Sequence, residues 1–136
     1  MSYKIIDIEG IGPAKTETLL KAGITTTDQL LETAGSAKGR ESLAAGSGLT
    51  KKELLRYVNM ADLMRIKGVG EEFSDLLEAG GVDTVKELAH RVPANLHAKL
   101  TEVAEAKSNL VRRKPTLAEC TAWVEHAKTL DPKVSH

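Results

Sequence analysis

The sequence has few aromatic side chains. Of its 136 residues only four are aromatic, namely Tyr3, Tyr57, Phe73 and Trp123. Proteins that read single-stranded nucleic acid by stacking its bases need a platform of such side chains. The composition therefore nearly excludes a protein that binds single strands by stacking their bases.

Net charge, cysteine pairs and long apolar runs are also missing. The 19 basic and 19 acidic residues cancel, so the strongly basic composition typical of a nucleic-acid-binding domain is absent. The one cysteine, Cys120, has no partner for a disulfide and cannot build a thiolate metal site alone. No apolar run approaches the roughly 18–20 residues that span a bilayer, and the N-terminus lacks a secretory apolar segment. We expect a cytoplasmic protein that does not bind membranes.

Alternating apolar and polar residues, which would indicate half-buried strands, are almost absent as well. The sequence does contain an internal repeat. Residues 8–30 read IEGIGPAKTETLLKAGITTTDQL, and residues 66–88 read IKGVGEEFSDLLEAGGVDTVKEL. The two copies align without a gap, and each begins with a Gly-hydrophobic-Gly turn, at residues 10–12 and 68–70. We expect both turns to need glycine, because it tolerates positive φ and close backbone approach.

Capping boxes predict where helices begin. In such a box a Thr hydroxyl and a Glu or Gln three residues later satisfy each other's backbone N–H groups. Four pairs have this spacing: Thr26 with Gln29, Thr50 with Glu53, Thr84 with Glu87, and Thr116 with Glu119. These signals predict an all-α protein with helices over about 13–22, 27–34, 37–45, 51–64, 71–79, 85–91, 94–107 and 117–130.

Apolar residues at helical spacing predict the core. The expected core residues are Leu19, Leu20, Ile24, Leu30, Leu31, Phe73, Leu76, Leu77, Val82, Val85 and Leu88, with Leu117, Cys120, Val124, Ala127 and Leu130 in the last helix. Trp123, beside this last stripe, is expected to be half-buried.

The repeated segment GIGPAKTETLLKAGITTTDQL resembles the helix-hairpin-helix motif, and two units in tandem resemble the paired arrangement of many DNA repair and replication proteins. Through ADLMRIKGVGEEFSDLLEAGGVDTVKELAHR and NLVRRKPT, the whole chain resembles a bacterial family of unknown function built on this tandem motif. The resemblance implies a compact, SAM-like helix-hairpin-helix fold. A first unit with an insertion would cover residues 1–48, a second unit 49–92, and a C-terminal helical extension packed on the same domain 93–136. Only nine residues precede the first turn, so one interpretation is a truncated first unit in which Ile5, Ile6 and Ile8 fill the core.

The resemblance also implies a phosphate site. In the family, backbone N–H groups of the turn and of the following helix grip a phosphate without reading sequence, as helix N-termini do generally. In the first unit this contact falls on Gly10, Gly12, Ala14 and Lys15. The glycines of the second turn, Gly68 and Gly70, are assigned a structural role.

Charge separates the two units. Residues 66–90 carry two lysines against six carboxylates, a net −4, and Glu71 and Glu72 stand where the second phosphate would bind. Residues 91–114 carry six basic residues against two carboxylates, a net +4, with Arg112, Arg113 and Lys114 as the one concentrated basic run. We call these three residues the basic patch. It is either a solvated loop or a contact for phosphate or an acidic partner that assists the first unit.

Catalytic patterns do not occur. The four histidines show no metal-ligand spacing, and no nucleophile triad or nucleotide-binding loop is present. We expect no enzyme and no cofactor. Two hypotheses remain: a sequence-independent nucleic-acid-binding module, for DNA in particular, or a protein-interaction scaffold that keeps the hairpin fold and binds an unidentified protein.

Overall fold

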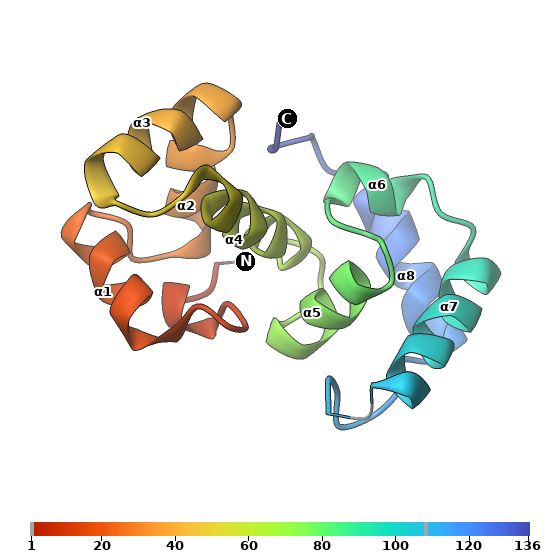
Figure 1. Ribbon diagram of the computed structural model, residues 1–136. Coiled ribbons are helices and arrows are strands. Elements are labelled where there is room, and N and C mark those ends of the chain that lie inside the picture. Colours follow the sequence, from red (N-terminus) through yellow and green to blue (C-terminus); the bar gives the residue numbers. More distant parts are fainter. Residues whose placement is uncertain (1, 108) are drawn as a thin grey trace.

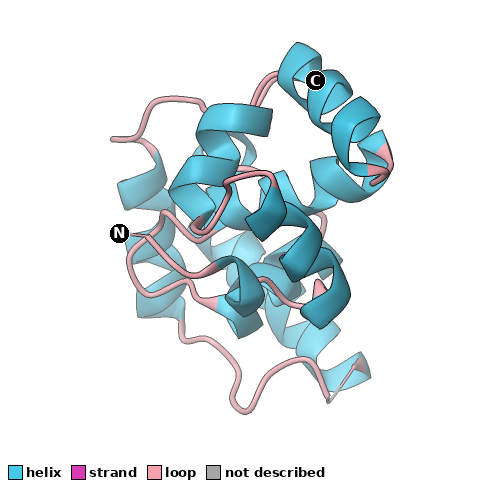
Figure 2. Cartoon of the chain, turned by 90° about the vertical axis from the view of Figure 1, so that its left-hand side faces the viewer, coloured by secondary structure: helices cyan, strands magenta, loops and turns pink. Residues whose placement is uncertain are grey.

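The computed structural model describes residues 2–107 and 109–136. In these residues the chain forms eight α-helices and a short 3-10 helix, η1 (Figure 1). Their bounds are η1 Ile5–Asp7, α1 Gly12–Lys21, α2 Thr27–Ala34, α3 Ala37–Ser47, α4 Lys51–Leu63, α5 Glu71–Ala79, α6 Val85–Ala89, α7 Pro93–Ala106 and α8 Leu117–Ala127. Figure 2 shows helices joined by loops, with no strand in the described part of the chain. The all-α prediction and all eight expected helices are confirmed.

Capping fixes most of the helix starts. The boxes are complete, with both hydrogen bonds present, at three of the predicted residues: Thr26, Thr50 and Thr116. At the fourth, the Thr84 hydroxyl accepts the N–H of Glu87 at 3.2 Å, but the Glu87 carboxylate bonds to Arg91 at 2.8 Å instead of returning to the cap. Ser36 caps α3 without a reciprocal partner, because the third helical residue there is Gly39. The box pattern therefore does not identify this cap.

The helices enclose two hydrophobic cores. The first core contains side chains of η1, α1, α2 and α4, and the second contains those of α5 to α8. Helix α4 lies between the two groups in Figure 1 and contributes to both, with Met60 and Ala61 in the first core and Leu63 in the second. Helix α4, which the sequence places at the start of the second unit, therefore connects the cores.

Most of the expected core residues are buried, but several are not. Leu20, Leu117 and Ile6 are 45%, 48% and 47% exposed, so the expectation that they pack in the core is wrong. In α1, Leu19 and Thr16 occupy the side that meets the core, and Leu20 falls on the other side. Trp123 is 2% exposed and not half-buried, since its ring packs against Phe73 with the centroids 5.1 Å apart.

The segment after α8, residues 131–136, returns to the first group of helices. The N–H of Ser135 donates to the carbonyl of Gly35 at 2.9 Å, and Val134 packs against the first core. Arg40 is 5% exposed and donates to the carbonyls of Gly35, Ala34 and Ser135. In Figure 1 this end of the chain lies beside α2 and α3. No helix in residues 2–107 or 109–136 is both long and apolar enough to cross a membrane.

Candidate nucleic-acid interface

The two glycine turns, residues 10–12 and 68–70, differ at their second glycine. Gly10 and Gly12 have φ of +81° and +74°, and Gly68 has φ of +89°. Gly70, however, has φ of −104° and an extended backbone, as an ordinary N-cap residue does. The expectation of positive φ is therefore confirmed for Gly10, Gly12 and Gly68 and wrong for Gly70.

The start of α1 is open to solvent. Its first turn contains no acidic residue, and no side chain caps it. Gly12, Pro13 and Ala14 are exposed. The first N–H groups of any α-helix lack intrahelical acceptors and form the positive end of its dipole. An anion can therefore reach the start of α1.

The start of α5 is acidic. Glu71 and Glu72 lie in its first turn, where the helix dipole stabilises negative charge. The Glu72 carboxylate accepts the backbone N–H of Arg112 at 2.8 Å and lies 3.1 Å from the Arg112 Nε. No side chain caps α5, and an open hollow of about 440 Å³ lies beside its start, lined by Gly70, Glu71, Glu72, Phe73, Arg112 and Arg113. The start of α5 therefore differs from that of α1 in its two carboxylates, one of which is paired with Arg112.

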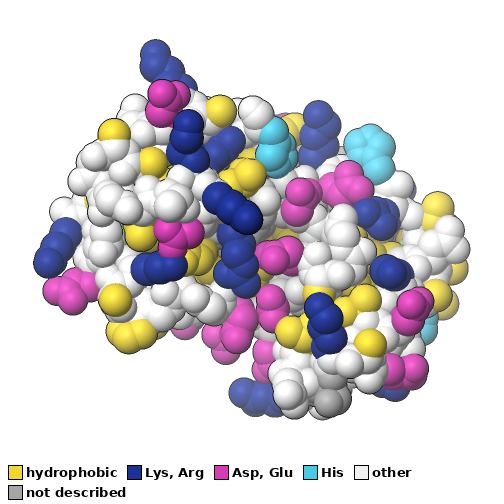
Figure 3. Space-filling model, in the orientation of Figure 1, with side chains coloured by type: hydrophobic (Ala, Val, Ile, Leu, Met, Phe, Trp, Pro, Cys, Tyr) yellow, Lys and Arg dark blue, Asp and Glu magenta, His cyan; other side chains and the backbone are white. Residues whose placement is uncertain are grey.

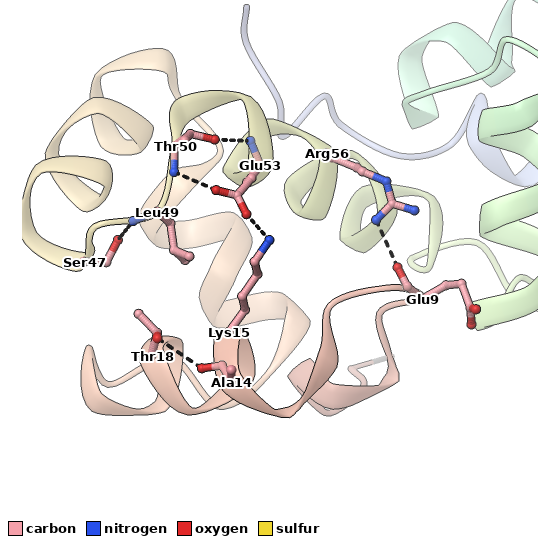
Figure 4. A network of polar contacts seen from close by, with 9 residues as sticks. All are labelled: Glu9, Ala14, Lys15, Thr18, Ser47, Leu49, Thr50, Glu53 and Arg56. Carbon is pink, nitrogen blue, oxygen red and sulfur yellow. Dashed lines mark hydrogen bonds and ion pairs between the residues drawn. The ribbon is translucent and has the colours of Figure 1, made fainter.

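Lys15 lies on the first turn of α1 but is paired with a carboxylate. Its Nζ binds the Glu53 Oε2 (Figure 4). The same Nζ lies 6.0 Å from the centre of the Tyr57 ring. The Glu53 Oε1 accepts the N–H of Thr50 at 3.1 Å. The hydrogen bond from Lys15, helped by those from Thr50, lowers the pKa of Glu53 to about 2, and the same contact with Glu53 raises the pKa of Lys15. In this structure, the positive charge of Lys15 is therefore balanced by the carboxylate of Glu53.

Arg56 is a further cation at the first glycine turn, and the sequence analysis does not identify it. From α4 it donates to the carbonyl of Glu9 at 3.0 Å (Figure 4), and it lies 3.6 Å from both Asp75 and Glu78 of α5. Burial raises the pKa of Glu78, an effect that the charge of Arg56 opposes. Arg56 therefore ties the first glycine turn to α5. No local pattern marks it, because its partners are far away in the sequence.

The basic patch is also paired. Both terminal nitrogens of Arg113 contact the Glu119 carboxylate, at 2.7 and 2.8 Å, and its guanidinium lies 5.2 Å from the centre of the Phe73 ring. This hydrogen bonding raises the pKa of Arg113 and lowers that of Glu119 to about 2. Lys114 binds Glu105 at 2.8 Å. With Arg112 on Glu72, every member of the patch has a carboxylate partner.

The structure brings part of the basic patch near the first glycine turn. An open hollow of about 450 Å³ lies between them, and it is lined by Glu9, Glu71, Glu72, Asn109, Leu110, Val111 and Arg112. Three carboxylates thus accompany one arginine in this hollow. Figure 3 shows acidic side chains gathered where the two groups of helices meet. A phosphate backbone that ran from the first turn to the patch would have to pass these carboxylates.

Within the described residues, no group of three or more His, Cys, Asp and Glu side chains is arranged to hold a metal ion. Cys120 is buried, and this burial raises the pKa of its thiol to about 11. The His126 Nδ1 accepts the backbone N–H of Lys67 at 3.1 Å, so α8 supports the segment that leads into the second glycine turn.

The lowered pKa values of two glutamates, Glu53 and Glu119, lead to a prediction for stability in acid. The pKa values of Glu53 and Glu119 are about 2 in the folded protein, against 4.5 for an unperturbed glutamate. Their contribution to stability is therefore complete above about pH 4.5 and is lost as the pH falls towards 2. We expect the free energy of unfolding, measured in urea between pH 7 and pH 2.5, to fall less steeply below pH 4.5 in the double variant Glu53→Gln, Glu119→Gln than in the parent. The single variant Glu17→Gln is the control and should follow the parent; equal slopes in all three proteins would contradict the prediction.

Comparisons with known proteins give one match. A family model described as a domain of unknown function (DUF4332) matches residues 9–130. No curated protein and no solved structure matches the chain.

Proposed function

The chain belongs to the family described as a domain of unknown function (DUF4332), and because that description names no activity, we propose a function from the residues themselves. The protein is a non-enzymatic module that binds the nucleic-acid backbone, that of DNA in particular, without reading its sequence. The contact is made by the first glycine turn and the start of α1. In this proposal the two repeats act as helix-hairpin-helix units, the second running from α4 through the glycine turn at residues 68–70 into α5.

One observation carries the proposal, and it is the open start of α1. A left-handed Gly10 and Gly12 lead into a helix whose first turn is exposed, uncapped and free of acidic residues. Backbone N–H groups at such a helix end bind phosphate oxygens, and they do so equally well for any base sequence. The start of α5 is also uncapped, but Glu71 and Glu72 lie in its first turn and oppose the approach of a phosphate.

Lys15 supplies the charge. Its side chain is 42% exposed and comes from the first turn of α1, and its ammonium group lies on the Glu53 carboxylate of α4. When a phosphate binds at the start of α1, Lys15 exchanges the Glu53 carboxylate for a phosphate oxygen. Arg112 and Arg113 would extend the contact, at the cost of their pairs with Glu72 and Glu119.

A protein-interaction module is the second candidate, and the pairing of the cations favours it. Lys15 and each member of the basic patch already have a carboxylate partner, which lowers the attraction of this surface for a polyanion. The measurement below separates the two candidates.

Lys15→Glu is expected to weaken binding to a mixed-sequence DNA duplex by about tenfold at low salt, because it removes a phosphate contact and adds a repulsive charge. The plot of log K against log salt should lose about one unit of slope. Fluorescence anisotropy with two unrelated labelled duplexes, each at several salt concentrations, measures both quantities. The loss should be similar for the two duplexes.

Lys128→Glu is the matched control. It makes the same charge change at the C-cap of α8, where Lys128 pairs with the exposed Glu125 at 3.3 Å. An equal loss in both variants would show that overall charge, and not the start of α1, governs binding. No binding of the parent at low salt would reject the DNA proposal and leave the protein-interaction module.

A further inference from the structure

Two capping-box glutamates each hold one cation of the proposed interface. Of the three complete boxes, those at Thr50 and Thr116 end in a glutamate, and each glutamate also binds a basic side chain: Glu53 binds Lys15, and Glu119 binds Arg113. The third box, Thr26 with Gln29, ends in a neutral amide, whose oxygen accepts from Thr25 and Thr26. The capping box at Thr26 thus only starts a helix, whereas the boxes at Thr50 and Thr116 start a helix and also pair with a basic side chain.

Glu53 uses its two oxygens for different partners. Oε1 accepts the N–H of Thr50 at 3.1 Å and completes the cap of α4, while Oε2 binds Lys15 Nζ (Figure 4). The Thr50 hydroxyl in turn accepts the N–H of Glu53 at 3.0 Å. These bonds fix the carboxylate on the first turn of α4, so that Lys15 reaches across from α1 to a charge that is already in place.

We infer that Glu53 sets the affinity of the first glycine turn for the nucleic-acid backbone, by holding Lys15 until a phosphate displaces it. This inference rests on the proposed function. In the free protein, Lys15 is paired with Glu53, and binding must break that pair before the ammonium group can meet a phosphate. The pair therefore lowers affinity and favours ligands with closely spaced phosphates over single anions, since several contacts together compete with one carboxylate.

The chain itself shows how to remove the pair and keep the cap. In the box that ends in Gln29, the amide oxygen accepts the N–H of Thr26 at 3.3 Å and that of Thr25 at 2.7 Å. In Glu53→Gln, the amide oxygen can accept the N–H of Thr50 in the same way. The amide NH₂ group then faces Lys15, and because both are donors, Lys15 is released.

Affinity for a mixed-sequence duplex, measured by fluorescence anisotropy at low salt, tests the inference. Glu53→Gln is expected to bind about two- to fivefold more tightly than the control Glu17→Gln, which corresponds to the loss of one exposed ion pair. Glu17 lies on α1 and pairs with Lys21 at 3.6 Å, so the control has the same charge change without touching Lys15. In a Lys15→Gln background the additional gain from Glu53→Gln should vanish, because the two residues act as one pair.

A second measurement uses the unaltered protein and does not depend on how any variant folds. The side-chain carboxyl carbon of Glu53, followed by NMR at neutral pH, should shift as the duplex is added, while that of Glu17 stays in place. Thermal melts of Glu53→Gln should keep one cooperative transition, because the cap of α4 is kept, at a temperature somewhat below that of the parent, because the ion pair with Lys15 is lost.

The outcomes separate this inference from the function beneath it. If the parent binds and Lys15→Gln weakens it, but Glu53→Gln matches Glu17→Gln and the Glu53 signal does not move, the inference is overturned and the proposed function stands. If neither the parent nor Glu53→Gln binds the duplex, both are overturned. If Glu53→Gln raises the affinity for the duplex in the Lys15→Gln background as well, the inference is also overturned, because the effect then does not depend on Lys15.

Discussion

Asp62→Ala is expected to lower the free energy of unfolding by about 3–5 kcal/mol. Asp62, at the end of α4, is 1% exposed. One carboxylate oxygen accepts from Arg65 at 2.7 Å, and the other accepts the N–H of Val85, the first residue of α6, at 2.8 Å. Alanine leaves the Arg65 side chain, 12% exposed, without its charge partner and a buried N–H without an acceptor.

Urea unfolding at neutral pH measures this loss. Asp28→Ala, at an exposed position in the first turn of α2, removes the same charge without burying an unpaired group. We expect it to cost no more than about 1 kcal/mol. Asp62→Asn, which keeps an acceptor for Val85, should fall between the two. Similar losses in Asp62→Ala and Asp28→Ala would show that the contact between α4 and α6 contributes little.

Gly68→Val is expected to cost about 2–4 kcal/mol, whereas Gly70→Val should cost less than about 1 kcal/mol. Gly68 has φ of +89°, which a β-branched residue adopts only with strain, and a Cβ there would lie 3.4 Å from the Nε1 of the buried Trp123. Gly70 has an extended backbone, and a Cβ there would meet nothing within 4 Å.

Thermal and urea unfolding of the two variants, in parallel, measure the difference. The sequence repeat predicts equal sensitivity at Gly12 and Gly70, because the alignment pairs them. The structure retains the expectation for Gly12, with φ of +74°, and removes it for Gly70. Equal losses from Gly68→Val and Gly70→Val would mean that the backbone of the second turn is not as described.

The helices could be predicted from sequence because their signals are local. Thr50 and Glu53 are three residues apart, and the bond that starts α4 needs nothing else. The state of the candidate cations could not be predicted in this way. Lys15 meets Glu53 across 38 residues, and Arg56 meets Glu9 across 47, so these pairings depend on how the helices pack.

Counting charge by segment fails for the same reason. The acidic stretch at residues 66–90 and the basic stretch at residues 91–114 look like two separate surfaces in the sequence. In the fold, Arg112 of the basic stretch is paired with Glu72 of the acidic stretch, so part of the two opposite net charges is neutralised within the molecule. The basic patch is continuous in the sequence, but its carboxylate partners come from three helices, α5, α7 and α8.

The contact between Arg40 and the segment after α8 matters for how the chain folds while it is being synthesised. Arg40 and Ser135 are 95 residues apart, and the ribosome makes the helices of the first core well before Ser135 emerges. During that interval the carbonyl of Gly35 lacks its later donor, the N–H of Ser135, and Val134 is not there to cover the first core. The first group of helices therefore gains its last contacts only after the helices of the second group have been synthesised. A stalled or shortened chain would lack residues 131–136, and the surface that they cover beside Gly35 and Arg40 would be accessible to chaperones and proteases.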